Sequence, residues 1–202
     1  MLFYITFVLS YTVFSSYTFF NDVINEKNAE LRVTNLDKYI NSFSTVFMNV
    51  FIYSFPVFYL INIFYVPGHF NLLKSALTII ISKYFSNIFF YYAHRYSHQN
   101  KFLYQFHRVH HYYSMPIGMR SAYTHPIDFV FFNMIPLGIT PFLLSADRFT
   151  IVFMIISGIH NTIVKEHSYI EEDNHHMIHH KYSNCNYGEV WIDKLMETYR
   201  AE

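Results

Sequence analysis

The sequence predicts an all-α integral membrane protein, with three to four transmembrane helices plus a hairpin and a cytosolic, helical, histidine-rich cap. Hydrophobic residues make up 52% of the 202-residue chain. Charged residues are only 14%, against about 25% in an average soluble domain. Long uncharged stretches, near the ~20 residues that a spanning helix needs, alternate with polar segments that hold most of the 13 histidines. No linker or repeat divides the chain, so residues 1–202 are expected to form a single membrane-embedded domain.

The first predicted span covers residues 1–20, which carry no charge. A secretory signal peptide would begin with basic residues and end at a small-residue cleavage site, and neither is present. We therefore expect an uncleaved anchor. Residues 21–40 are polar and mixed in charge, and they are expected to form a solvated connector with some helix.

Two further spans follow. Residues 41–66 carry no charge and are long enough to cross with a tilt, and the Pro-Gly pair at 67–68 ends them. Residues 72–93 form the next span, with Lys74 near its start and Lys83 in its interior, and run directly into His94. The first histidines are therefore expected on an extension of this helix beyond the bilayer.

The apolar segment 128–160 contains Pro136, Gly138 and Pro141, with Asp147 and Arg148 near its middle. Each half is about 17 residues, which is marginal for a full crossing. A tight hairpin is expected there. The polar segments 94–126 and 161–202 carry most of the histidines and are predicted to form the cap and its metal site.

Histidines recur in three short motifs with helical spacing. Residues three or four apart on a helix lie on one face, with Cβ atoms about 5–6 Å apart, so each motif presents its imidazoles together. Imidazole suits Zn, Fe, Cu and Ni. Eight such ligands exceed the needs of one tetrahedral zinc, which predicts two metal ions. The predicted ligands in the motifs are His94, His98, His107, His110, His111, His176, His179 and His180.

The three motifs read HxxxH, HxxHH and HxxHH, and in this order they resemble the integral-membrane fatty acid hydroxylase and sterol desaturase superfamily. The segment 122–128 is similar to that family's YxHPxE/D stretch. Asn186-Tyr187-Gly188 followed by Asp193 looks like its closing NYG…WD…GT stretch. The gap before Asp193 is shorter than the family's, a departure that bears on the subfamily and not on the metal site. The resemblance covers about half the chain, from His94 to the C-terminus.

This resemblance implies a membrane-bound di-iron oxidoreductase that uses O2 to hydroxylate or desaturate a lipid, with two non-haem Fe ions as cofactors. The C-terminal stretch looks most like sterol C5-desaturases, and segment 122–128 also resembles sterol C4-methyl oxidases, so a sterol is the favoured substrate. Fatty-acyl, sphingoid and alkylglycerol hydroxylases share the same boxes and are alternatives. A non-redox zinc-binding membrane protein is the alternative of another class. The endoplasmic reticulum or another internal membrane is the implied location.

The remaining histidines are weighed separately. His160 ends an apolar helix before Asn161, much like the family's HD/HN element, and is predicted as a ninth ligand. Three residues are expected beside the metal site, where they would orient the ligands: His125, His175 and Asn186. His125 could instead be a ligand itself. His69 and His167 match no motif and are expected to be ordinary surface residues.

The motifs that this sequence lacks indicate which partner molecules to expect. There is no GxGxxG nucleotide motif and no fused cytochrome b5-like HPGG element, so an external electron donor is expected. The resemblance implies a cytochrome b5- or ferredoxin-like protein with its reductase. Zero formal net charge gives no electrostatic support for a nucleic-acid partner. The single cysteine excludes an intrachain disulfide.

Basic residues predict the orientation. The histidine-bearing side of the membrane would carry eleven of them, while only Lys74 and Arg148 would lie on the other side. By the positive-inside rule the histidine side is cytosolic. The eleven are Lys27, Arg32, Lys38, Arg95, Lys101, Arg108, Arg120, Lys165, Lys181, Lys194 and Arg200.

Overall fold

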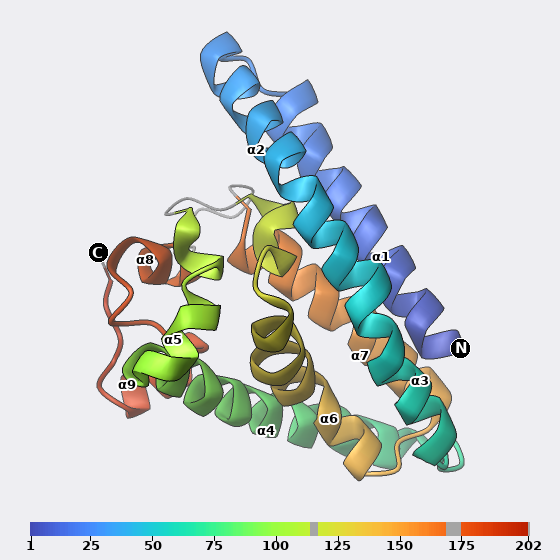
Figure 1. The fold of residues 1–202 in the computed structure, drawn as a ribbon. Coiled ribbons are helices and arrows are strands. Elements are labelled where there is room, and N and C mark those ends of the chain that lie inside the picture. Colours follow the sequence, from blue (N-terminus) through green and yellow to red (C-terminus); the bar gives the residue numbers. More distant parts are fainter. Residues whose placement is uncertain (114–116, 169–174, 202) are drawn as a thin grey trace.

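The computed structural model describes residues 1–113, 117–168 and 175–201, and within these ranges every regular element is a helix. The prediction of an all-α fold is confirmed. Figure 1 shows α1 and α2 side by side as an antiparallel pair, with α3 continuing α2 and α4 diverging from them towards the C-terminal helices. The α-helices are α1 (Leu2–Phe19), α2 (Ala29–Phe47), α3 (Ser54–Phe64), α4 (Leu72–Gln99), α5 (Lys101–His107), α6 (Ile135–Leu143), α7 (Arg148–His160), α8 (His175–Tyr182) and α9 (Val190–Leu195).

Three helical segments of the described chain are long and apolar enough to cross a membrane: Leu2–Ile24, Ala29–Phe64 and Arg148–Glu166. This agrees with an integral membrane fold. The second segment has 36 residues, or about 54 Å of helix, whereas a bilayer core is about 30 Å thick. Its polar first part therefore extends beyond the apolar layer. The predicted connector 21–40 is thus largely helical.

The predicted span 72–93 forms as the first part of α4, but α4 is not among those three segments. Its buried face carries small polar residues in place of large apolar ones. Small residues let membrane helices approach closely, and Ser86 Oγ donates a 3.3 Å hydrogen bond to Thr140 Oγ1 on α6. The low hydropathy of α4 therefore comes from the exposed Lys74 and Lys83 together with this small polar face. The buried residues of α4 are Ser75, Thr78, Ser82, Ser86, Tyr91, His94 and Ser97.

Segment 128–160 forms the predicted hairpin, with α6 and α7 as its arms. The turn between them lies against the loop that follows α3: Gly68 N donates to Ala146 O at 3.3 Å and Lys74 Nζ to Ser145 O at 3.1 Å. A Cβ on Gly68 would stand 2.4 Å from Ser145 O, so only glycine allows this approach. The hairpin therefore reaches the same end of the helix bundle as the loop before α4.

A π-helical turn, Met48–Tyr53, joins α2 to α3 and carries the buried Asn49. Asn49 Nδ2 donates 2.8 Å hydrogen bonds to the carbonyls of Ala122 and Thr124. From α1, Tyr11 OH donates to Met119 O at 2.6 Å. These buried bonds attach the 117–124 loop to the N-terminal helices, and that loop leads into one support of the histidine cluster.

Candidate metal centre

Nine histidines gather where α4, α5, α8 and the end of α7 meet, and they form two groups. Within each group the nitrogens that could bind a metal all lie within 4.8 Å of one another. The five-histidine group is His94, His98, His107, His111 and His179, and the four-histidine group is His110, His167, His176 and His180.

Local helix geometry divides the motifs between the two groups. His94 and His98 lie one turn apart on α4 and face the same group. After α5 the chain tightens into a 3₁₀ turn, His110–Tyr112, and His110 joins the other group while its neighbour His111 stays in the first. On α8, His179 likewise points to one group and the other two motif histidines to the other. Each of the last two motifs therefore serves both groups.

Hydrogen bonds orient the imidazoles of the five-histidine group. His94 Nδ1 donates to Tyr187 O and His179 Nδ1 to Cys185 O, both at 2.7 Å. A carbonyl can only accept, so in each ring Nδ1 carries the hydrogen and Nε2 keeps a free lone pair. Both lone pairs are then available to a metal ion.

The spacing of the Nε2 atoms indicates a shared cation. His98 and His107, His107 and His111, His111 and His179, and His179 and His98 are separated by 3.0 to 3.1 Å. Since His107 and His179 carry their hydrogen on Nδ1, at most two of these four contacts can be hydrogen bonds. Two nitrogens bound about 2.1 Å from one ion at a right angle lie about 3.0 Å apart, whereas a tetrahedral pair lies about 3.4 Å apart. The donor set therefore fits one ion with more than four ligands.

Burial keeps the imidazoles of the four-histidine group neutral. Loss of hydration lowers the pKa of His110 to about 3 and that of His167 to about 4. The same cause, reinforced by neighbouring imidazoles, holds the pKa of His176 and His180 well below the usual range. Neutral imidazole is the form that binds metal, so the four-histidine group is ready to bind a metal ion at neutral pH.

Several buried ring nitrogens have no hydrogen-bond partner among the described residues. They are His94 Nε2, His176 Nε2 and both ring nitrogens of His180. An unsatisfied buried polar atom costs about 1–3 kcal/mol. A metal ion in each group would satisfy the lone pairs, and this is the second reason that the residues fit metal.

Comparison with known proteins agrees with this arrangement. Residues 76–198, more than half of the chain, match the family described as "Fatty acid hydroxylase". The chain belongs to the fatty acid hydroxylase family. The matched region contains all nine histidines of the two groups.

Relatives within the family have several names. The chain is 30% identical over 129 residues to "Fatty acid hydroxylase domain-containing protein 2" of Macaca fascicularis, covering 61% of this chain and 37% of that protein. It is 36% identical over 75 residues (37% of this chain, 28% of the relative) to a "Putative methylsterol monooxygenase" of Dictyostelium discoideum. It is 25% identical over 132 residues (60% and 44%) to "Lathosterol oxidase" of Homo sapiens. The chain thus spans less than half the length of these relatives. No solved structure matches it.

His167 corrects an expectation drawn from the sequence. It was expected on the surface, but it is 5% exposed and belongs to the four-histidine group. Its Nδ1 donates to Thr162 O at 2.8 Å, and its Nε2 lies 3.5 Å from His110 Nε2. Past α7 the helix widens into a π-helical segment, Asn161–Glu166, which delivers residue 167 to the site. No motif spacing in the sequence marks this histidine.

His160, predicted as the ninth ligand, belongs to neither group. It is half-buried at the end of α7, and its ring packs edge-on against Phe14, with centroids 5.1 Å apart. It lies a helical segment before His167, so the geometry offers His167 in its place.

The two other accessory histidines also lie outside the groups. His125 Nδ1 accepts a 3.2 Å hydrogen bond from Ile127 N, and its ring packs on Phe106. His175 Nε2 lies 3.0 Å from Asp193 Oδ2, and its ring stacks on Tyr199. Neither side chain contacts a ring of the two groups through a hydrogen bond that the structure describes.

Asn186 organises the C-terminal segment. It is fully buried with a positive φ of 56°, a conformation that asparagine tolerates better than most residues. Its side chain donates to His175 O and Arg200 O and accepts from Arg200 N. It thereby fixes the loop whose carbonyls, at Cys185 and Tyr187, orient two histidines.

Two buried carboxylates support the site, and no role was assigned to them from the sequence. Asp128 Oδ1 accepts from His107 Nδ1 at 3.0 Å, and Thr124 Oγ1 donates to its other oxygen. Asp193 accepts from the main-chain N–H groups of Tyr187 (2.8 Å) and Gly188 (2.9 Å). Asp128 and Asp193 lie in the two segments that carry the family resemblance. Their place in those segments is the feature of the sequence that could have pointed to a role at the site.

We expect Asp128→Asn to weaken metal binding by about 10–100-fold, the usual cost of losing a group that orients a metal-binding histidine. The substitution keeps the size of the side chain but removes the charge that fixes His107. Metal content after dialysis against a graded chelator series would measure the effect. Asp37→Asn, on an exposed position of α2, is the matched control and should bind metal like the wild type. Equal retention in both variants would refute the role of Asp128.

Proposed function

We propose that this protein is a membrane-bound di-iron oxidoreductase that uses O2 to hydroxylate or desaturate a lipid. The observation that carries the proposal is the pair of histidine groups, in which nine imidazoles converge beside membrane helices. The five-histidine group would hold one iron ion and the four-histidine group the other. Iron bound there would supply the redox chemistry by which O2 oxidises an unactivated C–H bond.

The protein's own residues would position the reaction. Tyr187 O, Cys185 O and Asp128 hold ligand rings in one tautomer and one orientation, so little rearrangement is needed when metal binds. Both histidine groups line one cavity of about 70 Å³, bounded by α4, α6 and the end of α7. Because the cavity lies between these helices and beside both groups, it is the place for the reacting carbon of a membrane lipid.

A sterol is the substrate class that we favour. Relatives carry the names methylsterol monooxygenase, sterol 5(6)-desaturase and lathosterol oxidase. A fatty acid hydroxylase from Mycosarcoma maydis is also related, at 27% identity over 118 residues, so fatty-acyl, sphingoid and alkylglycerol substrates are the alternatives within the family. Comparing the lipids of cells with and without the protein would identify the substrate class; an unchanged sterol profile would refute the sterol assignment.

Electron supply provides the functional test. We expect iron-loaded protein with a lipid extract, O2 and NAD(P)H to be inactive until a cytochrome b5- or ferredoxin-like donor and its reductase are added. Product formation, followed by mass spectrometry with labelled O2, would then begin. Turnover without donor would reveal a redox module within the chain. No turnover with donor, together with tight binding of zinc and not iron, would favour a non-redox zinc protein.

We further propose that the histidine side faces the cytosol, in the endoplasmic reticulum or another internal membrane. Lys74 lies at the end of the bundle remote from the histidines, and Arg148 follows the turn packed there. A cysteine in place of exposed Lys101 on α5 should react with an impermeant reagent from the cytosol, whereas one in place of exposed Phe70 should not. The native Cys185 is buried and gives a low background. The reverse labelling pattern would overturn the orientation.

A further inference from the structure

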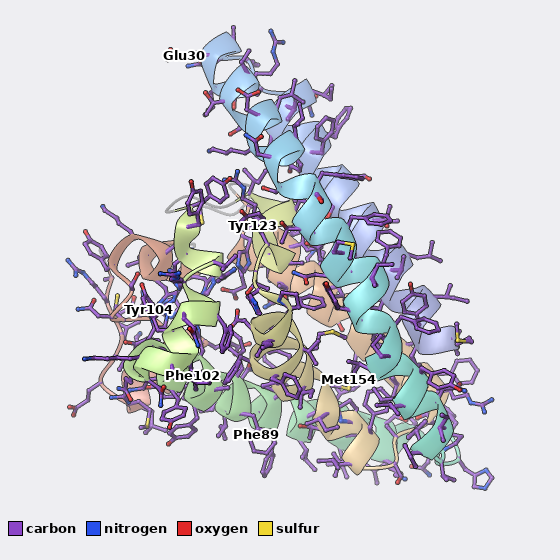
Figure 2. All side chains as sticks on the ribbon, in the orientation of Figure 1. Glu30, Phe89, Phe102, Tyr104, Tyr123 and Met154 are labelled. Atoms are coloured by element: carbon purple, nitrogen blue, oxygen red, sulfur yellow. The ribbon has the colours of Figure 1, made fainter. Side chains whose placement is uncertain are left out.

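Asn87 is a polar side chain in the part of α4 that precedes the histidines. It lines the cavity beside the two histidine groups and makes no hydrogen bond to any residue that the structure describes. It lies two helical turns before His94, on the same face of α4. Phe89, two residues further on, points out of the molecule (Figure 2). A polar side chain within a membrane helix is costly and is usually functional, so the amide of Asn87 indicates a ligand in the cavity.

A second polar wall faces the cavity from the end of α7. Asn161 Nδ2 donates a 3.3 Å hydrogen bond to Glu166 Oε1, and both residues line the cavity together with Thr162. Phe90 of α4 and Leu137 of α6 provide the apolar part of the lining. The space beside the histidines is therefore amphipathic, unlike the purely apolar tunnel that a hydrocarbon chain alone would require.

The size of the cavity limits what can occupy it. At about 70 Å³ the cavity is small, although it exceeds the about 10–15 Å³ that a single water needs. A sterol ring system or an acyl chain cannot enter whole. Only the reacting carbon and its nearest neighbours fit, and these atoms must supply hydrogen-bond partners for the polar side chains that line the cavity.

We infer that the cavity binds the oxygen-bearing end of a lipid, with a hydroxyl group hydrogen-bonded to the amide of Asn87. The carbon that is oxidised then lies within about three or four bonds of that hydroxyl, because both must share the same small space. Asn87 is a specificity-determining residue in this account. The inference rests on the proposed function and narrows its substrate class to lipids with a hydroxyl group near the oxidised carbon.

Matched lipid pairs test this directly. The iron-loaded full-length protein would be titrated in detergent micelles with cholestanol and cholestane, and with hexadecanol and hexadecane. For at least one pair, the wild type should bind the alcohol at least about tenfold more tightly than the hydrocarbon, the worth of one well-placed hydrogen bond. Asn87→Leu, which keeps the size but not the amide, should reduce this preference to about twofold with iron content unchanged. Lys83→Leu, on the same helix but exposed and outside the cavity lining, should keep the wild-type preference.

Equal binding of alcohol and hydrocarbon by the wild type in both pairs, or binding of neither lipid of either pair, would overturn the inference. So would an unchanged preference in Asn87→Leu. The proposed function is read out separately, from iron content and donor-dependent oxidation of a cellular lipid extract. If the protein oxidises lipids but binds the alcohol and the hydrocarbon equally, only the present inference is refuted. If the protein binds no iron, both the inference and the proposed function are refuted.

Discussion

His179→Ala should reduce lipid oxidation below about 1% of the wild-type rate, a larger loss than the 10–100-fold expected for supporting residues. His179 is fully buried, and its Nε2 lies 3.0 to 3.1 Å from those of His111 and His98. Its removal opens one position of the five-histidine group and leaves the lone pairs around it without their shared ion. Metal content should fall by about one ion per chain. Thermal stability should fall with it, because metal binding contributes to folding.

The control is His69→Ala. His69 is exposed and lies at the other end of the bundle, in the loop before α4, so its loss should change stability by no more than about 0.5 kcal/mol. Activity and metal content should match those of the wild type. Full activity in His179→Ala would mean that the five-histidine group does not hold the reactive metal.

His167→Ala should behave like a motif variant, although no motif contains this residue. Its ring is buried, its Nδ1–H is held by Thr162 O, and its Nε2 faces His110 in the four-histidine group. We expect loss of the ion from that group and a rate below about 1% of the wild type, again beyond the usual cost of a supporting residue.

His160→Ala is the matched comparison, since both histidines lie at the end of the same helical segment. His160 packs on Phe14 outside both groups, so its variant should keep both metal ions and lose little activity. Measuring metal content and turnover in both variants decides which of the two histidines is the metal ligand. Metal loss in His160→Ala with metal retained in His167→Ala would restore the assignment suggested by the sequence.

The sequence predicted the local features of this protein well. Uncharged stretches of spanning length located two of the three helical segments that are long and apolar enough to cross a membrane, whereas the third, Arg148–Glu166, begins in the segment predicted as a hairpin. Helical spacing identified eight of the nine histidines that gather. Both depend on short-range periodicity, which is visible along a chain. Segment 72–93 illustrates the limit: it forms a helix, but its two lysines and the small polar face that packs against α6 lower its hydropathy.

Features that depend on tertiary structure could not be predicted in the same way. The separation of His110 from His111 depends on a 3₁₀ turn. The recruitment of His167 depends on a π-helical segment that widens the end of α7. Asp128 meets His107 across 21 residues, because Asn49 attaches the intervening loop to the π-helical turn between α2 and α3. None of these contacts leaves a periodic pattern in the sequence.

The number of iron ions per chain tests the central claim most directly. Protein produced in iron-supplemented medium, purified and analysed for all transition metals, should contain two irons per chain, and His98→Ala and His176→Ala should each retain about one. Spectroscopy of the iron should then show mainly nitrogen ligands, as the two histidine groups require. A wild type that holds a single metal ion, or one that takes up zinc but no iron when iron is supplied, would contradict the account.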